Sequence, residues 1–355
     1  LALSTANLPD PVIDPAQGSS PEDYFDVDIY TGTGASHERS NFTFQPDFVW
    51  IKGRSIAENH YLVDAVRGAG KHLRSDQSTA ESSVDAGLTS FDSDGFTLGA
   101  SFQQTNGSPY TYVAWAWKAG TSVSGSTGGA GTSKSYTGSV STTSGFSIIA
   151  YEGNGTAGHT IPHHLDSAPE MIIVKNRDAG EGWSVYTEST GNTGFLNLNG
   201  TGAFATSSGE WNNTSPTSSV FTVGTQGRVN SNTQDHIAYC FHSVEGFSKF
   251  GSYTGNGSTD GPFVYTGFRP SFVMVKANAN EPWWMMDSSR DSYNVMSKEL
   301  VADGSDSEYD RTNAYLDFLS NGFKLRNNDG WHNNSGVTHI YMAFAENPFK
   351  YSNAR

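Results

Sequence analysis

The 355-residue sequence has almost no cysteine and no long apolar run. Its one cysteine, Cys240, has no second thiol to pair with, so the sequence predicts a fold without an internal disulfide. The apolar alternation of the surrounding "HIAYCF" favours a buried thiol at this position. No apolar stretch approaches the roughly 18 residues of a membrane-spanning helix, and no basic segment followed by an apolar one opens the sequence. We therefore expect no membrane insertion.

Positive charge is scarce as well. The chain has 21 Lys and Arg against 36 Asp and Glu, a formal net charge of −15. Such a chain repels phosphate backbones as a whole, so we expect no nucleic-acid partner. Only 16% of the residues are charged, while Gly (39), Phe (21) and Tyr (16) are abundant. This composition is typical of short strands joined by tight turns, and it predicts an all-β chain.

Several short signatures recur in the same order along the chain, and they predict an internal repeat. A buried-strand pattern follows a proline in "FQPDFVWIK", "SAPEMIIVK" and "FRPSFVMVK", and each proline stands six residues before the final lysine. An aromatic-led turn precedes this strand each time, as "YTGTG", "YEGNG" and "YTGNG". An alternating strand closes each unit, as "YVAWAW", "HIAYCF" and "HIYMAF", and period-two alternation is what a half-buried strand requires.

The signatures divide the chain into units at residues 29–118, 146–248 and 249–355. Units of about 100 residues with many short strands predict three tandem antiparallel β-sandwiches, jelly-roll-like and each able to fold alone. The Gly/Ser/Thr-rich segment 119–145 is predicted to be a flexible linker, whereas the short junction between the last two units predicts a rigid pair. Residues 1–28 are predicted to form an extended N-terminal arm that follows a segment before Leu1.

Several acidic residues are candidates for a glycosidase pair, because two carboxylates suffice for that chemistry. The candidates are Asp92, Asp94, Glu152, Asp287, Asp291 and Glu299. None recurs with a second acid at a fixed offset, so we predict no catalytic residue and no enzyme activity.

The sequence offers no cluster with metal-ligand spacing. His163 and His164 are adjacent, but no further His or Cys stands at a zinc-like offset. His236 and His339 occupy the position that Tyr112 holds in the first unit, which favours a packing role. We expect no metal site and no cofactor.

Tryptophans in the last two units are the candidates for a binding surface. Aromatic faces flanked by Asn and Asp can stack on sugar rings while the polar side chains bind hydroxyls. The alternative is that Trp183 and Trp284, which open a repeated strand, face the core. Trp331, in "NNDGWHNNSG", is the candidate best placed for exposure. The predicted binding residues are Trp211, Trp283, Trp284 and Trp331.

Segments such as "YTGNGSTDGPFVYTGFRPSFVMVK", "FDSDGFTLG", "YVAWAWKAG" and "IYMAFAENPFKYSNAR" closely resemble a repeat domain of uncharacterised function found in virion and tail-fibre-like proteins of marine bacteriophages. The resemblance covers Tyr24 to Arg355 and implies that Arg355 is the C-terminus. It also implies a place on the outside of a phage particle, contacts with other virion proteins and association into a homotrimer.

The function that we expect is that of a phage structural protein, a tail fibre or similar appendage whose C-terminal units recognise a host-surface glycan or protein. Two alternatives remain open within the same setting. One is a capsid decoration or head-fibre protein, and the other is a polysaccharide-degrading tailspike. A free-standing cellular lectin is a further alternative outside it.

Overall fold

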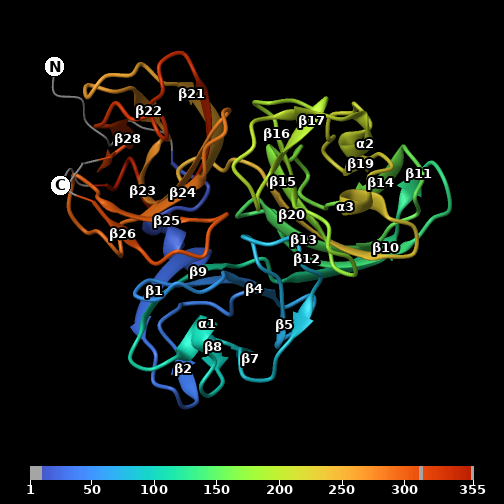
Figure 1. Ribbon diagram of the computed structural model, residues 1–355, viewed down its shortest axis with the longest axis horizontal. Coiled ribbons are helices and arrows are strands. Elements are labelled where there is room, and N and C mark those ends of the chain that lie inside the picture. Colours follow the sequence, from blue (N-terminus) through green and yellow to red (C-terminus); the bar gives the residue numbers. More distant parts are fainter. Residues whose placement is uncertain (1–9, 312–314, 353–355) are drawn as a thin grey trace.

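The computed structural model describes residues 10–311 and 315–352. These form three lobes around a common centre, which we define as residues 10–118, 119–247 and 248–352 (Figure 1). Nearly all regular structure is antiparallel β-sheet, as the composition predicted. No helix among the described residues has the length and apolar character needed to cross a membrane.

The first lobe contains a four-stranded sheet in the order β1-β9-β3-β4, a three-stranded sheet β2-β8-β7 and the pair β5-β6. Its elements are η2 (Pro15–Gln17), η3 (Pro21–Asp23), β1 (Phe25–Thr31), β2 (His37–Arg39), β3 (Phe48–Gly53), β4 (Tyr61–Asp64), β5 (Lys71–His72), β6 (Ser82–Ser83), β7 (Leu88–Asp92), β8 (Gly95–Leu98), α1 (Gln103–Asn106) and β9 (Thr111–Trp117).

The second lobe contains an eight-stranded sheet, β10-β12-β13-β20-β15-β16-β17-β18, and a three-stranded sheet, β11-β14-β19. Its elements are β10 (Thr121–Ser126), β11 (Gly128–Gly129), β12 (Ser135–Ser141), β13 (Phe146–Glu152), β14 (His159–Pro162), β15 (Met171–Asn176), β16 (Ser184–Thr187), β17 (Gly194–Asn197), β18 (Ala205–Thr206), α2 (Ser208–Trp211), β19 (Val220–Val223), α3 (Gly227–Asn230) and β20 (Asp235–Phe241).

The third lobe contains a six-stranded sheet, β21-β29-β23-β24-β25-β26, and a three-stranded sheet, β22-β28-β27. Its elements are β21 (Ser248–Thr254), β22 (Phe263–Tyr265), β23 (Phe268–Ala277), β24 (Trp283–Asp287), β25 (Lys298–Val301), β26 (Tyr309–Asp310), β27 (Leu316–Leu319), β28 (Gly322–Leu325) and β29 (Thr338–Pro348).

Each large sheet is buried on both faces, which explains why its middle strands are apolar almost throughout. In β9, Tyr112, Ala114 and Ala116 pack in a core formed with the small sheet of the first lobe. Their neighbours in the strand, Trp115 and Trp117, join a second core at the centre of the molecule. The alternation of small and large residues in "YVAWAW" therefore reflects two different cores on the two faces of one strand.

The central core joins all three lobes. Phe48 stacks on Tyr239 of the second lobe with 4.4 Å between ring centroids, and Phe25 stacks on Phe344 of the third lobe at 4.7 Å. Phe241 and Phe344 connect the second and third lobes at 6.2 Å. The aromatic residues that close the three large sheets are therefore buried in one shared core, whereas the sequence predicted units with separate cores.

A cycle of hydrogen bonds also crosses the three boundaries. The indole N–H of Trp183 donates to the carbonyl of Arg74 in the first lobe at 2.9 Å, and that of Trp283 donates to Asn197 in the second at 2.7 Å. Nε2 of His60 lies 2.9 Å from the carbonyl of Val301 in the third lobe. Since Nδ1 of His60 accepts from the indole of Trp50 at 2.7 Å, Nε2 carries the proton and donates it. Burial and the nearby ammonium of Lys52 lower the pKa of His60 to about 3, which keeps this neutral form.

The three lysines that end the repeated strand pattern are buried. The Nζ atoms of Lys52, Lys175 and Lys276 donate to the carbonyl of the following residue at 3.0, 2.6 and 2.7 Å. Burial lowers the pKa of each ammonium to about 8. The constant offset in the sequence thus corresponds to the same buried contact in all three lobes.

The prediction of a flexible linker at 119–145 is wrong. β10 and β12 extend the large sheet of the second lobe beyond β13. Tyr136 and Val140 of β12 are buried in the outer core of that lobe. The segment is polar because it is rich in Ser, Thr and Gly. Its β-branched and aromatic residues nevertheless stand at alternate positions, which is the pattern of a strand.

The N-terminal segment is not a free arm where the structure describes it. Ile13 is fully buried in the central core. Asp14 accepts a hydrogen bond from the N–H of Ala16 at 2.9 Å and so begins the turn η2. Strand β1 begins at Phe25, four residues before the predicted boundary. Residues 1–9 of the predicted arm lie outside the described residues.

Candidate binding surface

Three of the four predicted binding tryptophans are buried. Trp211 packs edge-to-face on Tyr186 with 5.9 Å between centroids, and Trp283 uses its N–H in the cycle of inter-lobe hydrogen bonds. Trp284 lies in the outer core of the third lobe. A ligand at the surface cannot reach these rings, so the alternative that the strand-opening residue Trp284 faces the core is confirmed.

Trp331 is half-buried, and its ring is already occupied. It stacks on Trp284 with 5.1 Å between centroids, and the guanidinium of Arg311 lies 4.4 Å from its centre. The same guanidinium lies 4.6 Å from the ring of Tyr309. Trp331 therefore covers the ring of Trp284, and its cation–π contact with Arg311 holds it in this position.

Beside Trp284 lies a charge cluster in which His332 and Glu299 are fully buried and Asp329 is half-buried. Nε2 of His332 is 2.8 Å from a carboxylate oxygen of Glu299, and Nδ1 is 3.3 Å from Asp329. Burial alone would lower the pKa of His332, but the carboxylates of Glu299 and Asp329 raise it to about 9. The imidazolium therefore persists at neutral pH and is compensated inside the fold.

Three of the other candidate acids each make a separate structural contact. Asp287 pairs with Arg290 at 2.5 Å within the core, and Glu152 pairs with Lys134. Asp92 accepts a hydrogen bond from Thr97 at 2.7 Å in its hairpin. Among the residues that the structure describes, no group of three or more His, Cys, Asp or Glu is arranged to hold a metal ion.

The packing role predicted for His236 and His339 is confirmed. His236 stacks on Tyr151 with 5.2 Å between ring centroids, and His339 stacks on Tyr253 at 5.0 Å. In the first lobe Tyr112 stacks on Tyr30 in the same way, at 5.3 Å.

The three tyrosines beneath these rings make one further contact in common. Each donates its hydroxyl to a backbone carbonyl of its own lobe: Tyr30 to Thr105 at 2.7 Å, Tyr151 to Val229 at 2.6 Å and Tyr253 to His332 at 2.6 Å.

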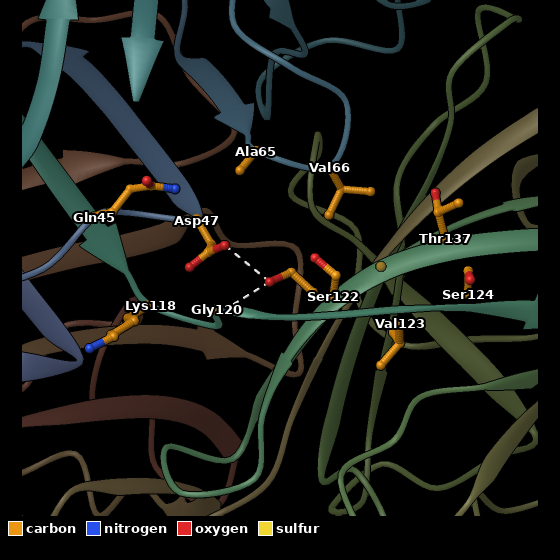
Figure 2. A pocket seen from close by; sticks show the side chains of 12 residues that line it. Gln45, Asp47, Ala65, Val66, Lys118, Gly120, Ser122, Val123, Ser124 and Thr137 are labelled. Carbon is orange, nitrogen blue, oxygen red and sulfur yellow. Dashed lines mark hydrogen bonds between the residues drawn. The ribbon is translucent and has the colours of Figure 1, made fainter. Parts of the chain in front are cut away.

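A groove of about 710 Å³ lies between the first lobe and the β10–β12 hairpin (Figure 2). Asp47 ties the two sides together, since its carboxylate accepts from the hydroxyl of Ser139 at 3.0 Å and the N–H of Ala119 at 2.9 Å. Burial raises the pKa of Asp47 above its usual range. The groove has Ser, Thr and Gly on much of its wall and no aromatic residue among those that line it. Asp47, the residue of this groove with the hydrogen bonds described above, therefore has a structural role.

Exposed apolar side chains gather elsewhere, on the third lobe. Six large apolar side chains are exposed among the described residues, and four of them belong to this lobe. Their exposed fractions are 46% for Phe263, 56% for Tyr265, 80% for Tyr293 and 39% for Val295. Sequence reasoning missed them because it weighed tryptophan above tyrosine and phenylalanine. The alternation of "FVYTG" around the buried Val264 was the available signal.

These four side chains flank the small sheet β22-β28-β27. Phe263 and Tyr265 stand on β22, at one edge of that sheet. At the other edge, Asn294 exchanges two hydrogen bonds of 2.9 Å with the backbone of Phe318 in β27. Tyr293 and Val295, on either side of Asn294, are therefore held beside β27. We call the outward side of this sheet with its two flanks the outer face of the third lobe.

One family matches nearly the whole chain. The family described as a domain of unknown function, DUF7483, matches residues 20–348. No curated protein and no solved structure matches the chain.

Proposed function

We propose that this chain, which belongs to the DUF7483 family of unknown function, is a structural protein of a bacteriophage particle whose third lobe contacts the host cell surface. The virion setting rests on the resemblance to repeat domains of phage virion and tail-fibre-like proteins. The place of the contact rests on one observation, the concentration of exposed aromatic side chains on the outer face of the third lobe.

We further propose that the three lobes are related β-sandwich units. Their large sheets contain the strand orders β1-β9-β3-β4, β13-β20-β15-β16 and β21-β29-β23-β24, and in each set of four the strand that comes first in the sequence pairs with the one that comes last. The tyrosine contact and the buried lysine recur at the same places in these orders. A fused set of three units closed around a shared core supplies the rigidity that a particle's exterior requires.

Exposed aromatic residues support a contact function because leaving their apolar surface in water is unfavourable and brings the fold no benefit. The central and outer cores already bury the aromatic residues that hold the sheets together. Phe263, Tyr265 and Tyr293 add nothing comparable to either core. A surface for a partner gives these residues a role.

The virion setting is tested with purified phage particles. An antibody raised against the chain should label particles of the phage that encodes it, as seen in electron micrographs. Label at the tail tip or fibres supports an appendage, and label in a regular pattern over the head supports the decoration alternative. Particles that carry no label would show that the chain is not a virion component.

The host contact is tested with the full chain. Labelled protein should bind host cells saturably and reduce adsorption of the phage in competition. The double variant Phe263→Thr/Tyr265→Ser should lose most of this binding, whereas Ile29→Thr, which removes an exposed apolar side chain from the first lobe, should keep it. Equal binding by both variants would remove the third lobe from the proposal.

The association state can be determined from the mass of the protein in solution. The resemblance implies a homotrimer, whose mass would be three times 38.2 kDa. Light scattering coupled to gel filtration distinguishes it from a monomer that has its three lobes closed within one chain.

A further inference from the structure

The outer face of the third lobe has an arrangement that points to the chemistry of its ligand. A row of side chains crosses the three strands: Phe263 of β22 is opposite Lys324 of β28, and Lys324 is opposite Asp317 of β27. Val264, Phe323 and Phe318, beside them in the strands, are buried in the outer core. Strict alternation therefore places Phe263, Lys324 and Asp317 on the outward side, over a span of about 10 Å.

The middle of the face is charged but neutral in sum. Nζ of Lys324 lies 2.7 Å from Asp260 and donates to the carbonyl of Gly261 at 2.8 Å. Nε of Arg326 pairs with Oδ2 of Asp317 at 2.5 Å. Since each of these two cations has its own carboxylate, neither is a free positive charge that could attract a polyanion.

Asp317 supplies a second, independent observation. Its side chain is almost fully buried, and its other oxygen, Oδ1, accepts no hydrogen bond from any residue that the structure describes. A buried carboxylate oxygen without a donor is costly, and such atoms in folded proteins call for a partner. A hydroxyl group is the simplest neutral donor for it.

Comparison with the second lobe shows that the aromatic flank is not required by the sheet. In β14 of the second lobe, Thr160 is opposite Thr222, next to the buried Phe221. In β22, Phe263 is opposite Lys324, next to the buried Phe323. The same place in a small sheet thus accepts threonine, so the phenylalanine serves something other than the fold.

A protein partner fits this face poorly. Protein interfaces have an apolar centre depleted of charge and a polar rim. Here the order is reversed, with charged groups in the middle and aromatic rings at both flanks. Rings that stack on C–H surfaces, together with charged groups that bind hydroxyls, are what a polyhydroxylated chain requires.

We propose that the outer face of the third lobe binds a saccharide chain, with Phe263 and Tyr265 stacking at one flank and Tyr293 at the other, and with a hydroxyl donating to Asp317 between them once the exposed Arg326 side chain moves aside. The inference rests on the proposed function, because it names the ligand class of that same contact. It commits to a neutral saccharide, since the cations of the face are already paired.

The test uses the full chain and a panel of immobilised short oligosaccharides built from neutral hexoses, deoxyhexoses and N-acetylhexosamines. The wild type should bind at least one member, and the same sugar in solution should compete. Phe263→Thr/Tyr265→Ser should bind about tenfold more weakly or worse, since two stacking surfaces are lost. Asp317→Asn, which keeps the shape of the side chain, should weaken binding as well. Ile29→Thr is the control and should bind as the wild type does.

Unfolding midpoints of all variants establish that they are folded, and the same preparations are applied to host cells. Cell binding without binding to any sugar of the panel would overturn the saccharide assignment and leave the proposed function standing, with a protein receptor as the partner. Sugar binding that the two face variants leave unchanged would also overturn it, because the site would lie elsewhere. Absence of both kinds of binding would overturn the proposed host contact and the inference together.

Discussion

The hydroxyl of Tyr239 donates a hydrogen bond of 2.7 Å to Oδ2 of Asp64, across the boundary between the second and first lobes. The same oxygen accepts from Nε of Arg67 at 2.5 Å, and Arg67 also contacts Glu81 at 3.1 Å. Glu81 in turn pairs with Arg177 of the second lobe at 3.0 Å. This boundary is therefore held by a chain of alternating charges that runs from the buried Asp64 and Arg67 to the half-buried Glu81 and Arg177.

The boundary between the third and first lobes has the same network. Trp115 donates its indole N–H to Asp287 at 3.0 Å, and Asp287 pairs with Arg290. Arg290 contacts Glu308 at 3.2 Å, and Glu308 pairs with Arg54 of the first lobe at 2.8 Å. Both networks join the first lobe to a neighbour, whereas the sequence predicted a flexible linker after the first unit.

The second lobe has a neutral pair at the corresponding place. Thr187 and Thr190 bring their hydroxyls to 2.9 Å where the other lobes have Asp and Arg. Met342 stands in β29 where Tyr239 stands in β20, as their pairing with Met274 and Ile173 shows. Met342 cannot donate a hydrogen bond, and the corresponding place in the second lobe has Thr187 and Thr190 in place of a carboxylate acceptor.

These correspondences predict the outcome of a transplanted boundary. Asp64→Thr should lower the free energy of unfolding by about 3–5 kcal/mol, because it leaves the buried Arg67 without its main partner. The triple variant Asp64→Thr/Arg67→Thr/Tyr239→Met copies the neutral set of Thr187, Thr190 and Met342, and should recover most of that loss. Urea unfolding of the two variants and the wild type measures it. A triple variant no more stable than Asp64→Thr would contradict the correspondence.

The buried histidines predict a loss of stability in mild acid. Burial lowers the pKa of His236 to about 4. The unfolded chain takes up this proton near pH 6.5. Between pH 6.5 and 4 the unfolded state therefore binds more protons than the folded state, and the free energy of unfolding decreases as the pH is lowered. His236→Tyr, which places at this position the residue found at Tyr112, should keep the stacking on Tyr151 and remove that slope. As the pH is lowered through this range, the free energy of unfolding of His236→Tyr should rise relative to that of the wild type by up to about 1.4 kcal/mol per pH unit.

The measurement for His236→Tyr is urea unfolding at several pH values between 7 and 4. Parallel curves for the two proteins would show that His236 is not the group that titrates. Asp76 and Asp303, whose pKa values burial raises to about 6, act in the opposite direction below pH 6 in both proteins and therefore cancel in the comparison.

Gly138 predicts a test of the β10–β12 extension. A Cβ at this position would lie 2.4 Å from the carbonyl oxygen of Ile148 and 2.7 Å from Cδ1 of Ile149. Gly138→Ala should therefore destabilise the chain by about 1–3 kcal/mol and make segment 119–145 more sensitive to protease. Gly202→Ala is the matched control, because nothing lies within 4 Å of its Cβ. If Gly138→Ala behaves like the control, β12 does not pack on β13 in solution.

The charge cluster of the third lobe predicts a measurable titration. Glu299→Gln removes the carboxylate that does most to raise the pKa of His332, so that pKa should fall from about 9 toward or below neutrality. NMR titration of the His332 ring measures it directly. At pH 7 the variant should also be less stable, since a buried imidazolium loses a partner. An unchanged pKa would mean that Asp329 alone supports the charge.

Local patterns predicted much of the secondary structure. The strand "FVWIK" and the alternating closing strand "YVAWAW" appear where the sequence placed them, as β3 and β9, and so do their counterparts in the other two lobes. These are predictions about neighbours within a few residues, which strand periodicity and turn chemistry decide. The packing of His236 and His339 on tyrosines was within reach for the same reason.

The failures concern contacts between residues far apart in the sequence. A Gly/Ser/Thr composition hides that Tyr136 and Val140 find an apolar surface to cover. A tryptophan in a polar stretch gives no sign of whether a ring such as Trp284 lies beneath it.

By itself, the sequence determined the all-β class, the order of the signatures and the short strands with their inward and outward sides, because spacing along one chain sets those. Only the tertiary structure decided that three lobes share one aromatic core, that Trp283 and Trp284 are buried while Phe263 and Tyr265 are exposed, and that Asp64 meets Tyr239. Each of these depends on which surfaces meet when the lobes close. That closure is governed by burial of apolar area, which has no direction and leaves no fixed spacing in the sequence.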